Sequence, residues 1–316
     1  MVPGYCRSAA GNGYEGRPAY LRRSPLRRRK IKRADDGRLS GSRINRGEEW
    51  LWYKPLSLNV GIIRGTTADQ DGNISMEEEI GTGEALSIAA AVHACGGIVI
   101  AQVKKVAARG TLDPKDIKIP GVLVDYIVQS DTADHLMTWD HEFNPAFNGD
   151  LKVPVDSLPA MELTNRKIIA RRCAMELIPD AVVNLGIGMP EGVSSIAAEE
   201  GIEGMVLTTE AGTIGGVPAG GGSFGAATNA HAIIDQPYQF DFYDGGGVDL
   251  AILGLAEADE HGNINVSKFK GRVAGCGGFI NITQNSKKSH LLRNLHGRRP
   301  ERVGSGREID HRSGGT

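Results

Sequence analysis

The sequence lacks the features that would commit it to a membrane or to a nucleic acid. Aromatic residues make up 5% of the 316 residues, and the formal net charge is only −2. No apolar run reaches the roughly 20 residues that a spanning helix needs, and no charge imbalance favours a nucleic-acid partner. These absences favour a globular protein, and we expect neither a membrane nor a nucleic acid as its partner.

Cysteine is scarce, and the four cysteines lie far apart: Cys6, Cys95, Cys173 and Cys276. Because none belongs to a closely spaced pair, a zinc site has little support. A calcium loop starting at Asp69 is excluded too, since Gly72 occupies its fourth rather than its sixth position. Scattered single thiols are typical of a reducing compartment, so we expect a cytoplasmic protein with no metal.

Two nucleotide-binding motifs are absent as well. No Gly-x-x-x-x-Gly-Lys-Ser/Thr occurs, which excludes a Walker NTPase, and residues 186–192 lack the Gly-x-Gly-x-x-Gly spacing of a dinucleotide site. Glycine is nevertheless plentiful, with 43 residues that gather in clusters. Such clusters indicate tight turns and backbone that can approach a ligand closely.

The two ends differ in composition from the middle. Residues 1–46 and 289–316 are rich in Arg, Gly and Ser and show no helical or strand periodicity. Such segments bury too little apolar surface to offset chain entropy, so we expect them to be disordered. Three interpretations stay open: basic nucleic-acid tails, an Arg-rich targeting peptide at the N-terminus, or sequence read out of frame.

The middle alternates predicted strands with predicted helices, which indicates an α/β fold of mainly parallel sheets with helices on both faces. We divide it into a first α/β domain at 47–130, a surface linker at 131–164 and a second α/β domain at 165–288. Strands are predicted at 59–65, 98–103, 122–128, 181–185, 205–209, 249–255 and 277–284, and helices at 84–95, 166–178 and 190–200.

Two matched pairs of segments indicate an internal repeat. TADQDGNIS at 67–75 resembles EADEHGNIN at 257–265, and CGGIVIAQV at 95–103 resembles CGGFINITQ at 276–284. The pairs keep their order, with offsets of 190 and 181 residues. Similar turns can arise independently, but two ordered matches favour a duplicated α/β domain whose copies are related by an approximate twofold axis.

The segment that carries most information is TTEAGTIGGVPAGGGSFGA at 208–226. Glu210 ends a predicted strand, and ligands of open α/β sheets bind outside the carboxyl ends of the strands. The glycines that follow would leave room for a bulky ligand and direct backbone N–H groups at it. On composition alone, such a glutamate is more often a turn residue than a nucleophile.

Four stretches are informative together: TTEAGTIGGVPAGG, QPYQFDFYDGGG, LGLAEADEHGNINVSKF and GCGGFINITQN. They resemble the acetate/propionate branch of the family I coenzyme A transferases, and the likeness runs from about residue 48 to residue 288. Members of that family continue with further sequence beyond both limits. A frame error or a truncated gene is therefore the favoured interpretation of the two ends.

The resemblance implies a role for several residues. Glu210 matches the glutamate that attacks an acyl-CoA thioester and then forms a glutamyl-CoA thioester. Backbone N–H groups near Gly277 and Gly278 are the candidate oxyanion donors. The remaining predicted residues would line the acyl and CoA tunnel: Gly212, Gly215, Gly216, Pro218, Gly220 and Gly221.

The resemblance implies no metal and no external cofactor, because coenzyme A is itself a substrate. Its expected partners are a short-chain acyl-CoA, a carboxylate and further copies of the same chain in a homo-oligomer. Two alternatives stay open. One is an acyl-CoA hydrolase, in which water intercepts the glutamyl thioester, and the other is an inactive fragment that only associates with full-length copies.

Overall fold

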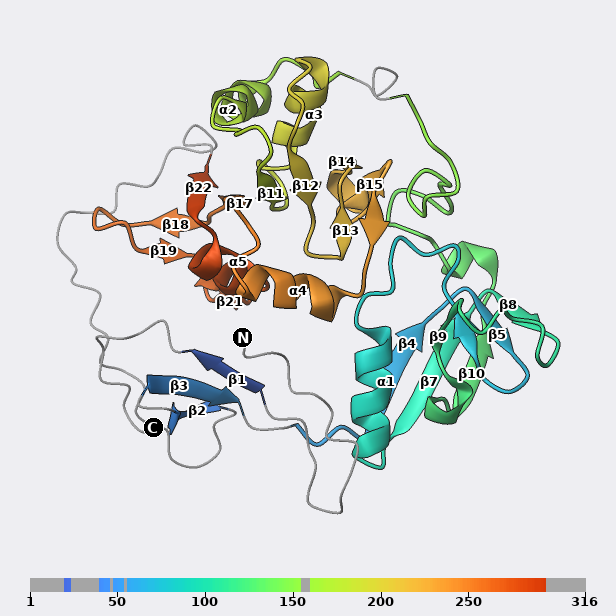
Figure 1. Cartoon of the computed structure of the whole chain (residues 1–316). Helices are drawn as coiled ribbons and strands as arrows, with labels where there is room; N and C mark the ends of the chain where they lie inside the picture. The colour runs from blue at the N-terminus through green and yellow to red at the C-terminus, as the bar shows by residue number, and fades with distance from the viewer. Residues whose placement is uncertain (1–19, 24–39, 46–47, 54–55, 155–159, 294–316) are drawn as a thin grey trace.

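The computed structural model describes residues 20–23, 40–45, 48–53, 56–154 and 160–293 (Figure 1). A three-stranded antiparallel sheet near the N-terminus contains β1 (Tyr20–Arg23), β3 (Glu48–Tyr53) and β2 (Ser40–Asn45), in that order. Strands β1 and β2 fall where the sequence predicts no regular structure. The rest of 1–46 and residues 294–316 lie outside the described residues.

The first half of the remaining chain contains a three-stranded parallel sheet with one helix against it. The sheet order is β10 (Tyr126–Gln129), β7 (Ile98–Val103) and β4 (Val60–Arg64), and the helix is α1 (Ala85–Ala94). Ala89 and Val92 of α1 share a core with Ile63 and Val99 of the sheet. A Cβ at Gly61 would lie 2.8 Å from Val92 Cγ2, so glycine lets the helix approach the strand.

A second, four-stranded sheet of the first half follows the order β8, β5, β6 and β9. Its strands are β8 (Lys105–Ala107), β5 (Thr67–Asp69), β6 (Ile74–Ser75) and β9 (Ile117–Ile119). Single 3-10 turns at Gly121–Leu123 and Thr132–Asp134 precede and follow β10.

The face of the β10–β7–β4 sheet that points away from α1 is apolar but exposed. Val60 and Ile62 of β4 are 53% and 74% exposed, and Tyr126 and Val128 of β10 are 59% and 51% exposed. Parallel sheets usually carry helices on both faces. Burying one Val or Ile side chain contributes about 1.5–3 kcal/mol, so this face leaves much stabilisation unrealised within the described part of the chain.

The second half contains a six-stranded sheet in the order β16, β13, β12, β11, β17 and β22. Strands β12, β11, β17 and β22 run parallel to one another, and β13 is antiparallel to both of its neighbours, β12 and β16. The strands are β11 (Val182–Leu185), β12 (Val206–Thr208), β13 (Thr213–Ile214), β16 (Ala232–Ile233), β17 (Leu250–Gly254) and β22 (Lys288–Leu292).

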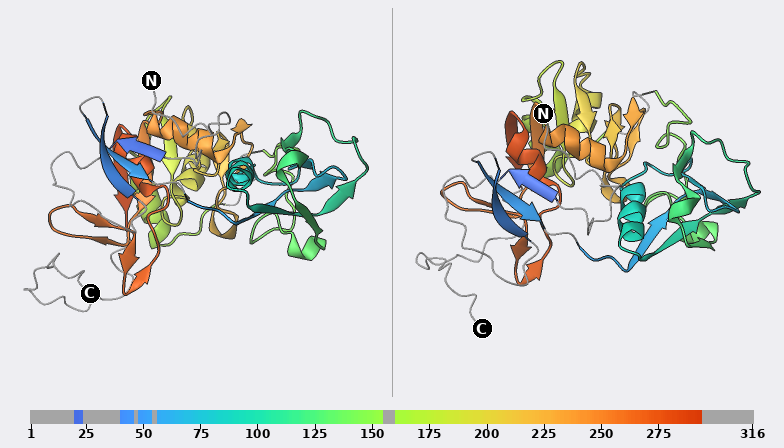
Figure 2. Two further views of the ribbon diagram at one scale, coloured as in Figure 1. Left: turned by 90° about the horizontal axis from the view of Figure 1, so that it is seen from below. Right: turned by 60° about the horizontal axis from the view of Figure 1, so that its bottom comes forward.

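Helices cover both faces of this larger sheet (Figures 1 and 2). On one face lie α2 (Asn165–Ala174) and α3 (Gly192–Glu199), and on the other lie α4 (Gln236–Asp244) and α5 (Phe279–Asn285). Residues of β17 alternate between the faces: Leu250 and Ile252 pack with α2 and α3, whereas Ala251 and Leu253 pack with α4 and α5.

Short two-stranded ladders surround this sheet and complete the second half. They are β14 (Val217–Pro218) with β15 (Ala227–Thr228), β18 (Glu257–Ala258) with β19 (Ile264–Asn265), and β20 (Lys268–Phe269) with β21 (Arg272–Val273). No helix within the described ranges is both long enough and apolar enough to cross a membrane.

Four strands recur in the two halves in the same order, at a spacing of 190 residues. Strand β4 leads to the hairpin β5–β6, to α1 and to β7, and β17 leads to the hairpin β18–β19, to α5 and to β22. Val60 pairs with Ile98 in the first half, and Leu250 pairs with Lys288 in the second, so each counterpart follows 190 positions later. The predicted duplication is confirmed, and the hairpins are its signature.

The second matched pair of segments, 95–103 and 276–284, was wrongly predicted to form equivalent structures. Residues 98–103 form β7, whereas the strand predicted at 277–284 is the helix α5, and the true counterpart of β7 is β22. Phe279 and Ile282 lie three residues apart, a helical spacing, and both contact the core under α4. Tertiary packing thus overrides the strand preference of an isoleucine-rich segment.

Most of the other predicted elements agree with the structure within a few residues, but one strand is displaced, and α4 and β22 were not predicted. Residues 289–292 of β22 lie in the C-terminal segment that was expected to be disordered. The strand predicted at 122–128 begins only at Tyr126, because a 3-10 turn occupies residues 121–123. Helix α4 was not predicted, although Pro237 in its first turn is a recognised signal for the start of a helix.

An aspartate fixes the same turn in both hairpins. Asp69 Oδ1 accepts hydrogen bonds from the N–H groups of Asp71 and Asn73 at 2.9 and 3.0 Å, and Oδ2 accepts one from Asn73 Nδ2 at 3.0 Å. Asp259 makes the same three bonds in its hairpin, at 2.9, 2.8 and 2.6 Å. Burial opposes the ionisation of Asp69, but these bonds hold its pKa below the ordinary value.

We expect Asp69→Ala to lower the free energy of unfolding by about 2 kcal/mol, because three donors lose a charged acceptor at a residue that is only 1% exposed. Chemical denaturation followed by circular dichroism measures this change. Asp259→Ala removes the same three bonds from an exposed turn, where water can replace the carboxylate, and should have a much smaller effect. Equal losses in the two variants would contradict the explanation.

Candidate functional site

Glu210 lies at the tip of a tight turn between β12 and β13. The Gly212 N–H donates to the Thr209 carbonyl oxygen at 3.2 Å, and the Thr209 N–H donates to the Thr213 carbonyl oxygen at 3.1 Å. Gly212 has a φ of +111°, and a Cβ there would lie 2.0 Å from the Ile234 carbonyl oxygen, so only glycine fits. The turn presents Glu210 at the carboxyl end of a parallel strand, where ligands of such sheets bind.

A buried hydrogen-bond network holds the end of β12. The Tyr243 hydroxyl donates to Thr208 Oγ1 at 2.9 Å and accepts from Gln239 Nε2 at 2.7 Å and Asn184 Nδ2 at 3.0 Å. Gln239 Nε2 also donates to the Thr209 carbonyl oxygen at 3.3 Å. Asn184 belongs to β11, and Gln239 and Tyr243 belong to α4. Hydrogen bonds from both elements therefore hold the end of β12, where the turn begins.

Two acceptors of this network have no hydrogen-bond partner in the described part of the protein, namely Asn184 Oδ1 and Gln239 Oε1. Both residues are at most 1% exposed. An unpaired buried acceptor costs about 1–3 kcal/mol, and the great majority of buried polar atoms are paired. The fold therefore keeps two costly acceptors directly behind the turn that carries Glu210.

The Glu210 carboxylate contacts the beginning of α5. The backbone N–H of Gly278 donates a hydrogen bond to it. A Cβ at Gly278 would lie 2.1 Å from Glu210 Oε2 and 2.8 Å from Phe240 Cζ, while its φ of −75° is open to any residue. Close approach, rather than backbone conformation, therefore requires glycine here. Of the two predicted oxyanion residues, Gly278 contacts Glu210. At the other, Gly277, a Cβ would have no neighbour within 4 Å.

The surroundings of Glu210 raise its pKa above the ordinary value. Burial is the main cause, the Gly278 N–H partly offsets it, and the negative charge of Glu84 adds to the rise. Glu84 is exposed and immediately precedes α1. Both halves of the chain therefore shape the electrostatic environment of this carboxylate.

Residues 80–84 of the first half contact the second half beside the Glu210 turn. The Gln236 N–H at the start of α4 donates to the Gly83 carbonyl oxygen at 3.1 Å, and Thr82 Oγ1 donates to the Asp235 carboxylate. Helices α1 and α4 accordingly lie close to each other (Figure 1). The candidate site thus lies where the two halves meet.

The glycines after Glu210 are packed mainly against protein. A Cβ at Gly215 would lie 2.3 Å from the His231 ring, and one at Gly216 would lie 2.3 Å from the Thr228 carbonyl oxygen. These glycines allow the close approach of neighbouring turns, and their expected role in lining a CoA tunnel stays a prediction. The remaining predicted lining residues lie in or just after β14: Pro218, Gly220 and Gly221.

The segment predicted as a surface linker packs against this glycine loop. The Trp139 N–H donates to the Gly222 carbonyl oxygen at 3.1 Å, and the hydroxyl oxygens of Thr138 and Ser223 lie 3.0 Å apart. A Cβ at Gly222 would lie 2.4 Å from Asp140 Oδ1. Sequence reasoning missed these residues because polar composition with Pro and Asn carries no periodic signal of packing.

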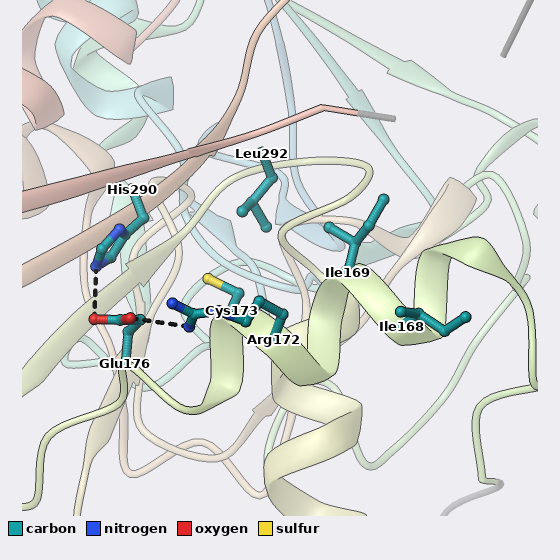
Figure 3. Close-up of a pocket in the computed structure, with 7 residues that line it drawn as sticks. All are labelled: Ile168, Ile169, Arg172, Cys173, Glu176, His290 and Leu292. Carbon is teal, nitrogen blue, oxygen red and sulfur yellow. Dashed lines mark hydrogen bonds and ion pairs between the residues drawn. The ribbon is translucent and has the colours of Figure 1, made fainter. Parts of the chain in front are cut away.

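A separate cavity of about 350 Å³ lies between α2 and β22 (Figure 3). The side chains of Lys288 and Arg172 donate to Glu176 at its border and lower the pKa of that carboxylate to about 2. Its lining includes none of the residues described around Glu210, so we do not assign it to the candidate site. The lining residues are Ile168, Ile169, Arg172, Cys173, Glu176, His290 and Leu292.

Comparison with known proteins identifies the family. Residues 28–130 match the family model described as Coenzyme A transferase. A caffeate CoA-transferase of Acetobacterium woodii is 49% identical over 275 residues, which cover 80% of this chain and 52% of that protein. The chain belongs to the coenzyme A transferase family. The acetate CoA-transferase YdiF of Escherichia coli K12 is 42% identical to this chain over 242 residues, which cover 76% of this chain and 45% of YdiF.

The solved structures agree with this coenzyme A transferase assignment. The crystal structure of the YdiF apoenzyme from Escherichia coli O157:H7 matches with a TM-score of 0.75 and 36% identity, covering 88% of this chain and 53% of that chain. The predicted fold class is therefore confirmed. The chain spans about half the length of the curated relatives it matches, and the family match begins at residue 28, within the segment that sequence analysis set apart.

We expect Glu210→Gln to raise the free energy of unfolding at pH 8. Burial raises the pKa of folded Glu210, so its ionised form is unfavourable above that pKa, whereas below the ordinary value of 4.5 both states are protonated and the penalty vanishes. Denaturation at pH 8 and pH 4 should therefore show a stabilising effect that shrinks in acid. The exposed Glu203→Gln is the control and should change neither value. A Glu210→Gln variant that is less stable at pH 8 would contradict the burial argument.

Proposed function

We propose that this chain carries the nucleophile of a transferase that moves coenzyme A between a short-chain acyl-CoA and a carboxylate such as acetate or propionate. The observation that carries the proposal is the partly buried Glu210 carboxylate at the carboxyl end of β12, which accepts one backbone hydrogen bond from the start of α5. The relatives named as acetate and caffeate CoA-transferases support the type of reaction and a carboxylate acceptor.

The reaction begins with two substitutions at carbonyl carbon. The Glu210 carboxylate attacks the thioester carbonyl of the acyl-CoA, the carbon–sulfur bond breaks, and an acyl-glutamyl anhydride forms as CoA thiolate leaves. The thiolate then attacks the glutamyl carbonyl. The anhydride bond breaks, the first carboxylate departs, and a glutamyl-CoA thioester remains.

A second carboxylate then reverses these steps. It attacks the glutamyl-CoA carbonyl, which expels the thiolate and forms a new anhydride, and the thiolate attacks the acyl carbonyl of that anhydride. The new acyl-CoA leaves, and Glu210 is again a free carboxylate. An anhydride keeps the acyl group activated, whereas a serine or threonine hydroxyl would hold it as a less reactive ester.

The electrostatics around Glu210 suit this chemistry. A carboxylate with a raised pKa is more basic than an exposed one and gains less from solvation, which favours nucleophilic attack. The Gly278 N–H already lies on a Glu210 oxygen, so it is placed to stabilise the oxyanion that forms when the glutamyl carbonyl is attacked. Loss of such a donor costs about 3 kcal/mol at other acyl-transfer sites.

A solved relative supports a thioester intermediate. The YdiF structure described as a thioester complex with CoA matches this chain with a TM-score of 0.74 at 35% identity, over 87% of this chain. That complex concerns YdiF itself. It favours a covalent CoA adduct as the species to look for on Glu210.

We expect the protein to form propionyl-CoA when it is given acetyl-CoA and propionate, as measured by chromatography with mass detection. Glu210→Ala should lower the rate by at least ~1000-fold, because nucleophile and covalent intermediate are both lost. Glu203→Ala, at an exposed site, is the matched control. Release of free CoA without propionyl-CoA would identify a hydrolase instead, and full activity of Glu210→Ala would refute the proposal.

Gly278→Ala should slow transfer by about 100-fold, because its methyl group would occupy the place of Glu210 Oε2 and displace the carboxylate from its N–H donor. Mass spectrometry of the peptide containing residue 210, after incubation with acyl-CoA, should show less CoA adduct. Gly254→Ala is the control, since its nearest atom would be 3.7 Å away, at an ordinary contact distance. Equal rates in the two variants would argue against the Gly278 contact.

A further inference from the structure

The ring of Phe240 lies beside the carboxylate oxygen that Gly278 contacts. A Cβ at Gly278 would lie 2.1 Å from Glu210 Oε2, 2.8 Å from Phe240 Cζ and 3.0 Å from Phe240 Cε1. Because one point is so close to both groups, the tip of the ring and the carboxylate oxygen are neighbours. The Glu210 carboxylate therefore meets a backbone donor and an aromatic ring at the same place.

The packing of α4 against α5 holds this ring in position. Phe240 is 9% exposed, and its ring centroid lies 5.8 Å from that of Tyr243 at an interplanar angle of 71°. This edge-to-face contact ties Phe240 to the hydrogen-bond network that supports the end of β12. Phe279 and Ile282 of α5 belong to the same apolar core. The ring thus has a defined place next to Glu210.

An apolar ring at this place has an electrostatic consequence. A carboxylate that an apolar group covers loses hydration, and this loss disfavours its charged form. Burial is the main cause of the raised pKa of Glu210, and the Gly278 N–H is the one group among the described residues that partly offsets it. Phe240 is placed to supply part of that burial.

We propose that Phe240 is a positioning residue for Glu210, whose ring keeps water from one side of the Oε2 atom and so keeps this oxygen poorly solvated and strongly nucleophilic. The inference rests on the proposed transferase function. A hydrated carboxylate must shed water before it attacks a thioester, whereas one covered by a fixed ring has already lost part of its hydration. The ring acts on the reaction through Glu210.

The ring also distinguishes the successive states of Glu210 by their charge. The resting carboxylate is an anion, whereas the acyl-glutamyl anhydride and the glutamyl-CoA thioester are neutral at this position. An apolar neighbour disfavours a charged group and not a neutral one. An interaction that treats two states differently changes the rate of their interconversion, unlike one that treats both alike. The contact with Phe240 therefore favours formation of the covalent intermediates.

Other titratable residues come from the elements around Glu210: Glu84 before α1, Asp235 at the start of α4, Tyr243 near its end, and Cys276 before α5. Burial, with a smaller contribution from the Glu210 charge, raises the pKa of Tyr243, so this hydroxyl stays neutral where Glu210 titrates. The exposed Glu84 acts on Glu210 through its charge. Salt at ~1 M screens such a charge but leaves burial unchanged, so it isolates the effect of the ring.

The first test compares Phe240→Leu with wild type in the full chain, with acetyl-CoA and propionate as substrates in high salt. Leucine keeps the core apolar but lacks the tip of the ring. The acid limb of kcat/KM should move to lower pH, because a better hydrated Glu210 ionises more readily. At pH 8 kcat should fall about 10-fold, because the carboxylate is then less basic. An equal loss at every pH, with an unmoved acid limb, would show that Phe240 only supports the core and would overturn the proposal.

Phe242→Leu is the matched control from the same helix. Phe242 is 39% exposed, and its ring contacts Gly247 rather than Gly278, since a Cβ at Gly247 would lie 2.2 Å from Phe242 Cε2. This variant should keep the acid limb of the wild-type profile. The same shift in both leucine variants would assign the effect to a general disturbance of α4 and would overturn the proposal.

A second variant does not depend on whether the core tolerates a smaller side chain. Phe240→Tyr keeps the ring and adds a hydroxyl at Cζ, the ring atom nearest to the Cβ position of Gly278. That hydroxyl can donate to Glu210 Oε2 and stabilise its ionised form, so the acid limb should again move to lower pH. Phe242→Tyr is the control and should leave it in place. A wild-type profile for Phe240→Tyr would show that the ring tip does not face the carboxylate, which overturns the proposal.

A thermodynamic cycle tests the contact without any substrate. The stabilisation that Glu210→Gln produces at pH 8 should be about half as large, or less, in the Phe240→Leu background, because less of the burial penalty remains to be relieved. Denaturation of the four proteins measures this coupling. An unchanged stabilisation overturns the role of Phe240, whatever the activity. The expected coupling in a protein that transfers no CoA would overturn the proposed function but not the effect of the ring on Glu210.

Discussion

Parallel strands need a helical layer on each face, and this constraint organises the protein. Side chains alternate along a strand, so a parallel sheet presents two apolar faces. Exposing either face to water lowers the stability of the fold. In the second half the two helix pairs meet this need, and the carboxyl ends of the strands lie beyond the two helical layers' cores. Glu210 emerges at those ends, which is why a carboxylate can be partly buried and still reachable.

At the candidate site a hydrogen-bond network supports the strand that carries Glu210, while the surroundings of the Glu210 carboxylate disfavour its ionised form. The network around Tyr243 fixes the end of β12, and two of its amide oxygens have no hydrogen-bond partner among the described residues. Burial and the charge of Glu84 oppose the ionisation of Glu210, whereas one N–H group at the start of α5 supports it. The carboxylate is held in place without being fully neutralised, a balance that suits a nucleophile better than a structural ion pair.

Sequence reasoning located β4, β7, β11, β12 and β17, the hairpin repeat and the position of Glu210, because each depends on local periodicity or on a short motif. It missed β22, of which residues 289–292 lie in the segment that was expected to be disordered. It failed at α5, whose isoleucines favour a strand until packing against α4 decides for a helix. It also missed that residues 131–154 support the glycine loop, although it did expect Gly278, 68 positions after Glu210, to lie at the same site. Such contacts depend on how distant segments meet, and no local pattern encodes them.

Among the described residues, one edge of β4 carries no neighbouring strand, and such an edge has a consequence for a protein in a cell. A row of free main-chain donors and acceptors beside an apolar surface is a template on which any extended chain can add, including an unfolded copy of this one. The risk of aggregation and proteolysis would be greatest for as long as that edge stays uncovered. The abundance of the protein should consequently depend on how well that edge is covered, rather than on the stability of either half alone.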